Sequence, residues 1–365
     1  CGAKRTNEDH HRLRLVPNAT HSFNKHLSAV GGLINDWFEG ARRLGSNDLG
    51  ASLGSAAGGE DSGGPRLLRG ESGCDESPSH VNLSGTRANA RMLGNGVLWL
   101  AEELRNDTTV RSLDLSSNNI RHAAANALAS ALEVNTTLGS LELSHNNLLG
   151  NGAQTLAASL QNSKSLTRLG LKSNGIGATG AAALAVSLAS NRCSLTSLNL
   201  RGNGLTAVGA ASLAAALKSN TNLTELDLSE NLVKETGATA LAEALNTNAS
   251  LTSLSLRYNG IRSAASKLAA SLTSNTTLNS LDLKQNDLSQ VDLIAIAAVI
   301  GRNTTLMTLE LGLDASTLAA AAEEVVAINR VLERNRDRAA EAEAQVEAAV
   351  DEAWAWPRED ESEAE

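Results

Sequence analysis

Three short patterns in the sequence have the residue types and spacing of known chemical sites. The segment GIGATG, from Gly175 to Gly180, has the spacing of a dinucleotide-binding turn, in which glycines let the backbone approach a pyrophosphate. The segment GASLG, from Gly50 to Gly54, has the spacing of a sharp turn that exposes a nucleophilic serine. His21 and His26 lie close together, as metal ligands often do. Each pattern requires particular secondary-structure elements around it.

The surrounding sequence does not supply those elements. A dinucleotide site needs an acidic residue about twenty positions after the glycines, and Asn199 stands there instead. Ser52 lies in Gly/Ser-rich sequence with no strand before it. The two histidines are five positions apart, whereas two ligands on one helix face are four apart. We therefore predict a non-enzymatic protein that uses no cofactor and no metal.

The middle of the chain is a series of repeats. Eight segments follow the pattern LxxLxLxxN or a close variant, and their first positions advance by 27 to 29 residues. Alternating leucines predict a short strand, and leucines four apart in the Ala-rich sequence that follows predict a helix. A single strand-helix unit cannot bury its apolar face, so the units must stack on one another. The segments begin at Val110, Leu138, Leu166, Leu195, Leu223, Leu251, Leu278 and Leu306.

Two other positions recur, a glycine in four of the eight units and an asparagine in seven. Glycine precedes the predicted helix, where we expect a tight turn, at Gly152, Gly180, Gly209 and Gly237. The asparagine that ends the pattern can hydrogen-bond backbone groups of neighbouring turns and so form a ladder. These asparagines are Asn118, Asn146, Asn174, Asn203, Asn231, Asn259 and Asn286.

The repeat pattern and its Ala/Leu helices resemble the leucine-rich repeats of the ribonuclease-inhibitor class over about residues 80–320. That resemblance implies an α/β solenoid shaped as a horseshoe, with about eight 28-residue repeats, an inner parallel sheet and outer helices. The repeats also resemble those of NOD-like receptors and of Ran GTPase-activating proteins. The former suggests a protein-interaction scaffold, and the latter suggests a regulator of a small GTPase.

Composition restricts the partners and the compartment. Only 2% of the 365 residues are aromatic and the formal net charge is -9, which argues against nucleic acid as a partner. No run of eighteen apolar residues predicts a membrane span. Three widely spaced cysteines and no visible leader predict a cytoplasmic protein. Because the sequence begins at Cys1, a leader upstream of it stays open.

Eight N-x-S/T triplets would suit a secreted glycoprotein, so an extracellular location stays open as the alternative. Four of them, however, share one repeat position three residues before the first leucine, and the repeat pattern explains these without sugars. They are Asn135, Asn248, Asn275 and Asn303.

Charge and composition divide the chain into four parts. Residues 1–43 form an N-terminal segment whose apolar positions predict an amphipathic helix over 21–43. Residues 44–79 are Gly/Ser-rich and predict a flexible linker. Residues 80–320 hold the repeats, with a degenerate first unit near Val81. Residues 321–365 hold 5 basic and 14 acidic residues, which sum to -9, the entire net charge.

The C-terminal part is predicted to be helical. Residues 316–356 predict one long helix with apolar positions seven apart, which suits either a cap on the last repeat with an acidic, solvated second half or a coiled coil.

Partner binding is predicted on the concave face of the sheet, because strand alternation sends the leucines inward and the intervening residues onto that face. The charged and aromatic residues there form a basic cluster, an acidic cluster and an Arg-Tyr pair. We expect a protein partner, with a small GTPase as the alternative, to contact Arg168, Lys172, Arg201, Glu225, Asp227, Glu230, Arg257 and Tyr258.

Overall fold

The computed structural model describes residues 79–85, 93–190 and 192–354. The chain divides into two compact units, Cys1–Asp75 and Glu76–Glu365, and all described residues belong to the second. The predicted N-terminal helix over 21–43, almost all of the predicted linker and the last eleven residues lie outside the described residues.

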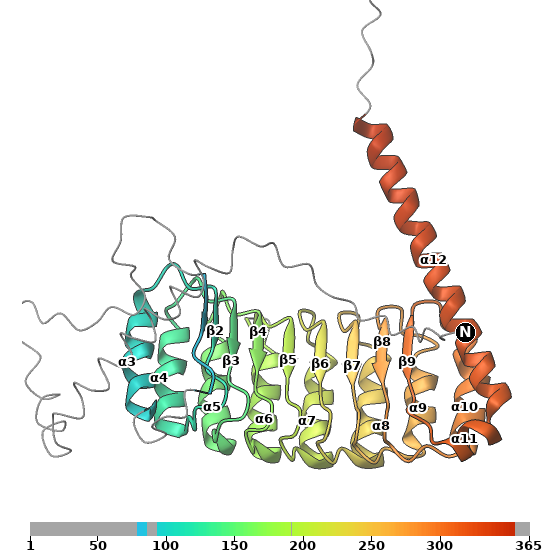
Figure 1. Ribbon diagram of the computed structural model, residues 1–365, viewed down its shortest axis with the longest axis horizontal. Coiled ribbons are helices and arrows are strands. Elements are labelled where there is room, and N and C mark those ends of the chain that lie inside the picture. The colour runs from blue at the N-terminus through green and yellow to red at the C-terminus, as the bar shows by residue number, and fades with distance from the viewer. Residues whose placement is uncertain (1–78, 86–92, 191, 355–365) are drawn as a thin grey trace, which may run out of the picture. The chain divides into compact units, whose positions relative to one another are not determined.

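Nine short strands form one parallel sheet in sequence order (Figure 1). Their register is constant, so each central residue pairs with the central residue of the next strand, as Leu198 does with Leu226. The strands are β1 (His80–Asn82), β2 (Ser112–Asp114), β3 (Ser140–Glu142), β4 (Arg168–Gly170), β5 (Ser197–Asn199), β6 (Glu225–Asp227), β7 (Ser253–Ser255), β8 (Ser280–Asp282) and β9 (Thr308–Glu310).

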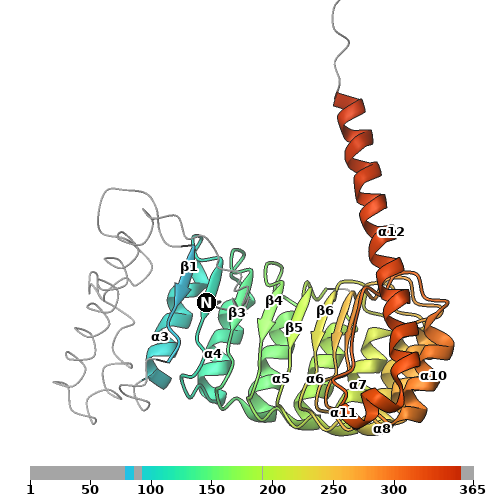
Figure 2. The same cartoon turned by 45° about the vertical axis from the view of Figure 1, so that its right-hand side comes forward.

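A helix follows every strand and packs on the same face of the sheet (Figure 2). Packed helices lie 8–10 Å apart in general, whereas strands lie about 4.8 Å apart, so the array curves with the sheet inside. We call the sheet face opposite the helices the concave face. The repeat helices are α3 (Leu93–Asn106), α4 (His122–Leu132), α5 (Leu149–Leu160), α6 (Gly177–Leu188), α7 (Thr206–Leu217), α8 (Lys234–Leu245), α9 (Ala264–Ser271) and α10 (Gln290–Ile300).

Leucines and alanines fill the space between sheet and helices. Leu226 at the centre of β6 and Leu241 in α8 are at most 2% exposed, and their equivalents in β2 to β8 and in α4 to α9 are buried in the same way. The predicted α/β leucine-rich solenoid is therefore confirmed. β1 and α3 supply the degenerate first unit that the sequence placed near Val81.

The repeated asparagines form the ladder that the sequence predicts. Asn203 donates from Nδ2 to the carbonyls of Leu171 and Leu200, each at 2.9 Å, and its Oδ1 accepts the backbone N–H of Asn174 at 2.9 Å. One side chain thus satisfies backbone groups in two successive turns. Buried amides without such partners would cost about 1–3 kcal/mol each, so this ladder fixes how each repeat sits on the last.

A second ladder uses the asparagine three residues before the first leucine of the repeat. Asn248 donates to the carbonyl of Leu217 at 2.8 Å and accepts the N–H of Leu251 at 2.8 Å. Four of its members are the sequon asparagines Asn135, Asn248, Asn275 and Asn303, all of which are buried. Their side-chain amides are used in hydrogen bonds to the backbone, which agrees with the interpretation that these N-x-S/T triplets belong to the repeat pattern.

The prediction that the repeated glycines form tight turns before the helices is wrong. Gly152, Gly180, Gly209 and Gly237 lie inside the helices rather than in turns before them. A Cβ on Gly237 would meet Val233 Cγ1 at 2.8 Å and Ala210 Cβ at 3.0 Å. At Gly180, Gly209 and Gly237 an added Cβ would come within 3.0 Å of an alanine Cβ in the preceding helix, so close helix packing favours glycine there, whereas at Gly152 the corresponding distance is 3.5 Å.

The C-terminal helical segment is also different from the prediction of one helix over 316–356. It forms α11 (Ala315–Ala320) and α12 (Ala322–Trp354), because Ala321 takes φ -120 and ψ 30 and ends the first helix. Ala321 is fully buried, as are Ile328 and Leu332. Breaking the helix lets all three side chains bury at the end of the solenoid, and this packing outweighs the helix propensity of alanine.

Three consecutive residues of α12 close the last repeat. Arg334 Nη1 donates to the carbonyl of Gly301 at 3.1 Å, Asn335 Nδ2 to that of Leu306 at 2.9 Å, and Arg336 Nε to that of Met307 at 2.9 Å. The rest of α12 extends away from the repeats (Figure 1), and its described side chains from Glu341 onward are exposed. Over the described part of the chain, no helix is both long and apolar enough to cross a membrane.

Candidate functional site

The residues predicted to bind a partner lie in four rows across the concave face. In the first seven repeats the fourth and sixth positions of LxxLxLxxN are buried leucines, so the third, fifth, seventh and eighth positions face away from the helices. Because the strands are parallel and in register, equivalent positions of successive repeats lie side by side. We refer to these as the third, fifth, seventh and eighth rows.

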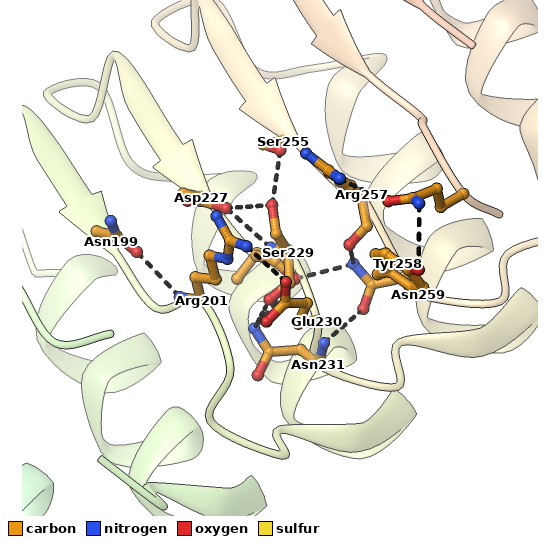
Figure 3. Close-up of polar contacts among 12 residues, drawn as sticks. Asn199, Arg201, Asp227, Ser229, Glu230, Asn231, Ser255, Arg257, Tyr258 and Asn259 are labelled. Carbon is orange, nitrogen blue, oxygen red and sulfur yellow. Dashed lines mark hydrogen bonds and ion pairs between the residues drawn. The ribbon is translucent and has the colours of Figure 1, made fainter. Parts of the chain in front are cut away.

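Arg201 and Glu230 form the central ion pair of this face (Figure 3). Arg201, in the seventh row, donates from Nη2 to Glu230 Oε1 of the next repeat at 2.6 Å. This hydrogen bond raises the pKa of Arg201 and lowers the pKa of Glu230. The positive charges of Lys172 and Arg257 lower the pKa of Glu230 further. The predicted basic and acidic clusters are therefore joined rather than merely adjacent.

Asp227 stabilises the turn that follows β6, a role that was not predicted from the sequence. Its Oδ1 accepts the backbone N–H of Ser229 at 2.9 Å and the Ser229 hydroxyl at 2.5 Å, and that hydroxyl also contacts the hydroxyl of Ser255 at 2.8 Å. Asp114 and Asp282 accept the N–H two residues onward in the same way. The recurrence of Asp, Asn or Glu in the fifth row was the available signal for this turn.

Tyr258 is a fixed aromatic side chain in the eighth row. It is 51% exposed, and its backbone takes a left-handed φ of 58, which is uncommon for a bulky residue. The Arg257 guanidinium lies 5.8 Å from the ring centroid. Gln285 accepts from Arg257 Nε at 2.8 Å and donates to the Tyr258 hydroxyl at 3.1 Å. Gln285 belongs to the next repeat and was not among the predicted residues.

Arg168 and Glu225 lie apart from this network. Both are exposed in the third row. Ser197 of β5 lies between them, because it pairs with Arg168 of β4 on one side and with Glu225 of β6 on the other. Neither forms an ion pair with another described residue. The structure therefore brings together Lys172, Arg201, Asp227, Glu230, Arg257 and Tyr258, but leaves Arg168 and Glu225 separate.

The described residues contain no group of three or more His, Cys, Asp or Glu side chains that could hold a metal ion. Cys193 is buried, and burial raises the pKa of its thiol, which disfavours the reactive thiolate. Gly180 of the GxGxxG pattern is packed inside α6. The chemistry available on the concave face is ion pairing, hydrogen bonding and aromatic contact.

Comparison with known families decides the class of the repeats. A family model described as "Leucine Rich repeat" matches residues 106–129, 134–157, 162–185, 191–214, 219–242, 247–264 and 274–297. The chain is a leucine-rich repeat protein. Such proteins are typically non-enzymatic interaction scaffolds, and no catalytic family is identified for this one. No curated protein matches the chain.

Solved structures similar to this leucine-rich repeat protein include "Leiomodin-1 Actin-Binding Site 2 (ABS2)", with TM-score 0.38 and 22% identity over 42% of this chain and 88% of that one. A Caenorhabditis elegans tropomodulin C-terminal domain has TM-score 0.37 and 17% identity over 41% and 90%. A structure of the yeast Rad7 and Elc1 complex has TM-score 0.30 and 15% identity over 61% and 70%.

Proposed function

We propose that this leucine-rich repeat protein is a non-enzymatic scaffold of the cytoplasm that binds a protein partner on its concave face. The proposed contact surface is centred on Arg201, Glu230, Arg257 and Tyr258. The single observation that carries the proposal is Tyr258, an exposed aromatic side chain held in place by Arg257 and Gln285.

A fixed aromatic residue suits an interface for an energetic reason. Tyrosine and arginine are enriched among residues that dominate binding energy. A side chain that is already ordered loses less conformational entropy on binding, which otherwise costs about 0.5–1.5 kcal/mol per side chain. The two bonds made by Gln285 and the left-handed backbone of Tyr258 restrict this side chain before a partner arrives.

The test begins with capture of the partner by a photo-crosslinking amino acid placed at Asp287, an exposed residue two positions after the Gln285 that bonds Tyr258. The affinity of the captured protein is then measured for the wild type and for the triple variant Arg201→Ala, Asp227→Asn, Tyr258→Ala. Asparagine at 227 keeps an acceptor for the Ser229 N–H. We expect at least a tenfold weaker Kd, with a loss of no more than about 1 kcal/mol in the free energy of unfolding from the broken Arg201–Glu230 ion pair.

A matched control uses the opposite side of the solenoid. Val186 and Val208 are exposed on α6 and α7, so Val186→Ala with Val208→Ala removes apolar surface without touching the concave face. This control should bind as the wild type does. Equal affinity of the triple variant and the wild type would overturn the proposal.

Regulation of a Ran-like GTPase is a second candidate, favoured by the exposed acidic half of α12, which carries Glu341, Glu343 and Glu347. We infer that the repeats belong to the ribonuclease-inhibitor class because their period is close to 28 residues. That class occurs together with an acidic tail in the Ran GTPase-activating proteins that the sequence resembles. Single-turnover GTP hydrolysis by Ran, measured with and without the full chain, decides this candidate, and an unchanged rate rejects it.

A further inference from the structure

The parallel sheet ends at β9, and one edge of this strand has no neighbouring strand among the described residues (Figure 1). On its other edge, Thr308 donates its N–H to the Asn279 carbonyl at 3.0 Å. The Glu310 carbonyl accepts the N–H of Leu283 there at 2.7 Å. Because alternate residues of a strand bond to opposite sides, the N–H and C=O of Leu309 point to the open edge.

The preceding repeats show what such groups bond when a further strand is present. Leu256 donates its N–H to the Asp282 carbonyl of the next strand at 2.8 Å, and Leu283 donates to Glu310 in the same way. Leu311 holds the equivalent position, and its N–H has no acceptor in the part of the chain that the structure describes. A strand edge of this kind is a template for pairing with another extended chain.

Two leucines at this end of the solenoid are also left partly uncovered. Leu281 and Leu283 of the preceding unit are at most 1% exposed. Their equivalents Leu309 and Leu311 are only half-buried, because no further repeat stacks against them. An added strand would gain apolar burial by placing one aliphatic side chain beside each of these leucines.

The C-terminal cap covers only the start of this edge. In the preceding unit, the Asn279 carbonyl accepts two N–H groups from the start of the next strand. The equivalent carbonyl of the last unit, that of Met307, accepts Arg336 Nε at 2.9 Å instead. Among the described residues, α12 donates to no backbone carbonyl beyond Met307. The backbone groups of Leu309 and Leu311 therefore stay open.

Glu310 sets the charge that an added strand should carry between its two aliphatic residues. It lies in the fifth row, with Asp282 beside it on one side and the open edge on the other. Its exposed carboxylate pairs with Lys284 at 3.1 Å. Two carboxylates thus share one lysine at this end of the row. Opposite charges side by side on neighbouring strands stabilise a sheet and like charges destabilise it, so a lysine or arginine fits beside Glu310.

We propose that β9 binds an extended segment of a protein partner as a tenth strand, parallel to β9, with the pattern aliphatic–basic–aliphatic. The aliphatic residues lie beside Leu309 and Leu311, and the basic residue lies beside Glu310. Leu309 accepts the N–H of the basic residue, and Leu311 donates to its carbonyl. In strand addition of this kind, backbone bonds give affinity and the alternate side chains give specificity.

Hydrogen exchange followed by NMR tests the edge directly in the full chain. The probe is a fluorescein-labelled peptide, Gly-Ser-Leu-Lys-Leu-Ser-Gly, whose binding is measured by fluorescence anisotropy. In the free chain, the amides of Leu309 and Leu311 should exchange faster than that of Thr308, which bonds β8. Saturating peptide should slow both by about tenfold or more. Protection of both amides in the free chain, or no change with the peptide, would overturn the proposal.

Backbone methylation separates strand pairing from simple apolar attraction. N-methylation of the lysine removes the N–H that bonds Leu309, whereas N-methylation of the leucine after it removes an N–H that points away from β9. We expect about fivefold or more weaker binding for the first peptide and less than about twofold for the second. Equal loss in the two peptides would contradict strand addition.

The charge preference is tested with a peptide that has glutamate in place of its lysine. It should bind about threefold or more weakly, because like charges then lie side by side at Glu310. In Glu310→Gln this difference should shrink. Equal binding of the lysine and glutamate peptides by the wild type would reject the basic residue of the pattern.

A pair of variants tests the strand itself. Leu309→Pro and Leu309→Ala both lose the leucine side chain, but only proline loses the outward N–H. Proline should abolish peptide binding, whereas alanine should weaken it by only about threefold. Equal binding by the two variants would overturn the proposal. If the proline variant does not fold, the methylated peptides decide.

A second copy of the chain is the other occupant to exclude. Val81 and Leu83 at β1 have the required spacing, but uncharged Asn82 lies between them. Sedimentation velocity should show the same monomer for the wild type and Leu309→Ala over a wide range of concentration. Self-association of the wild type that Leu309→Pro abolishes would show that the edge binds another copy, and would overturn the proposal.

The outcomes are independent of the concave-face function. The triple variant at Arg201, Asp227 and Tyr258 leaves β9 unchanged and should bind the peptide as the wild type does. Loss of the captured partner by the triple variant, with no peptide bound at β9, would leave the concave-face function standing and reject strand addition.

Discussion

The asparagine ladder and the seventh row both recur in successive repeats, but only the ladder keeps one residue type. Asn231 is fully buried and bonds backbone groups of the neighbouring turns. Two residues earlier, the seventh row changes among lysine, arginine and serine from one repeat to the next. The difference indicates that the ladder specifies the fold, whereas the row varies without changing it and, in the proposed function, supplies contacts to the partner.

Burial explains the contrast. A buried amide has only protein groups to bond, so every repeat requires the same donor and acceptor in the same place. A side chain on the concave face can bond water instead, and its type can vary at little cost to folding. Four substitutions test this contrast, in descending order of their expected effect on stability.

Loss of one ladder residue should have the largest effect. Asn231→Ala leaves the carbonyls of Leu200 and Leu228 and the N–H of Asn203 without their side-chain partner. Since a buried unsatisfied group costs about 1–3 kcal/mol, we expect a loss of about 3 kcal/mol or more in the free energy of unfolding. Urea denaturation followed by circular dichroism measures it. Exposed Asn151→Ala in α5 is the control and should change stability by less than about 0.5 kcal/mol.

Close helix packing should give the next largest effect. Gly237→Ala places a methyl group against Val233 and Ala210, and overpacking typically costs about 1–3 kcal/mol. The expected sign opposes helix propensity, which favours alanine over glycine. Gly301→Ala is the control, because nothing lies within 4 Å of its added Cβ. If Gly237→Ala raises the melting temperature, the helices are not packed as described.

The C-terminal cap should come third. Asn335→Ala removes the bonds from Nδ2 to the Leu306 carbonyl at 2.9 Å and to Asn303 Oδ1 at 3.3 Å. We expect a loss of about 1–2 kcal/mol, with faster amide hydrogen exchange in α10 and β9 than in β5. Val346→Ala, in the exposed half of α12, should leave exchange unchanged. Uniform acceleration across all repeats would contradict a local capping role.

The concave ion pair should have the smallest effect on stability. Glu230→Gln is expected to cost no more than about 1 kcal/mol at neutral pH, as is typical of partly exposed pairs. Because the pKa of Glu230 is lowered in the folded chain, the pair stabilises fully above the ordinary glutamate pKa and loses this contribution as pH falls through the lowered value. The stability difference between wild type and variant should therefore shrink below about pH 4. A constant difference from pH 7 to pH 3 would contradict the pair.

The sequence predicted the repeats, the first ladder and the face on which charged residues gather, because each follows from a regular period. It did not predict the bond between Arg201 and Glu230 or the role of Gln285, because these side chains come from different repeats and their orientation depends on the turn between them. The break at Ala321 was missed for a related reason, since helix propensity is local and burial at the end of the solenoid is not.

The leucine pattern alone establishes that this chain is a stack of strand-helix units, because a pattern with a constant period can bury its apolar side chains only by repetition. Which polar residues are structural becomes visible only when the repeats are stacked. Asp227 and Glu230 have similar side chains three positions apart, yet one accepts the N–H of its own turn and the other pairs with the preceding repeat. The physical reason is distance: hydrogen bonds act over about 3 Å, and that proximity is set by the stacking of whole repeats.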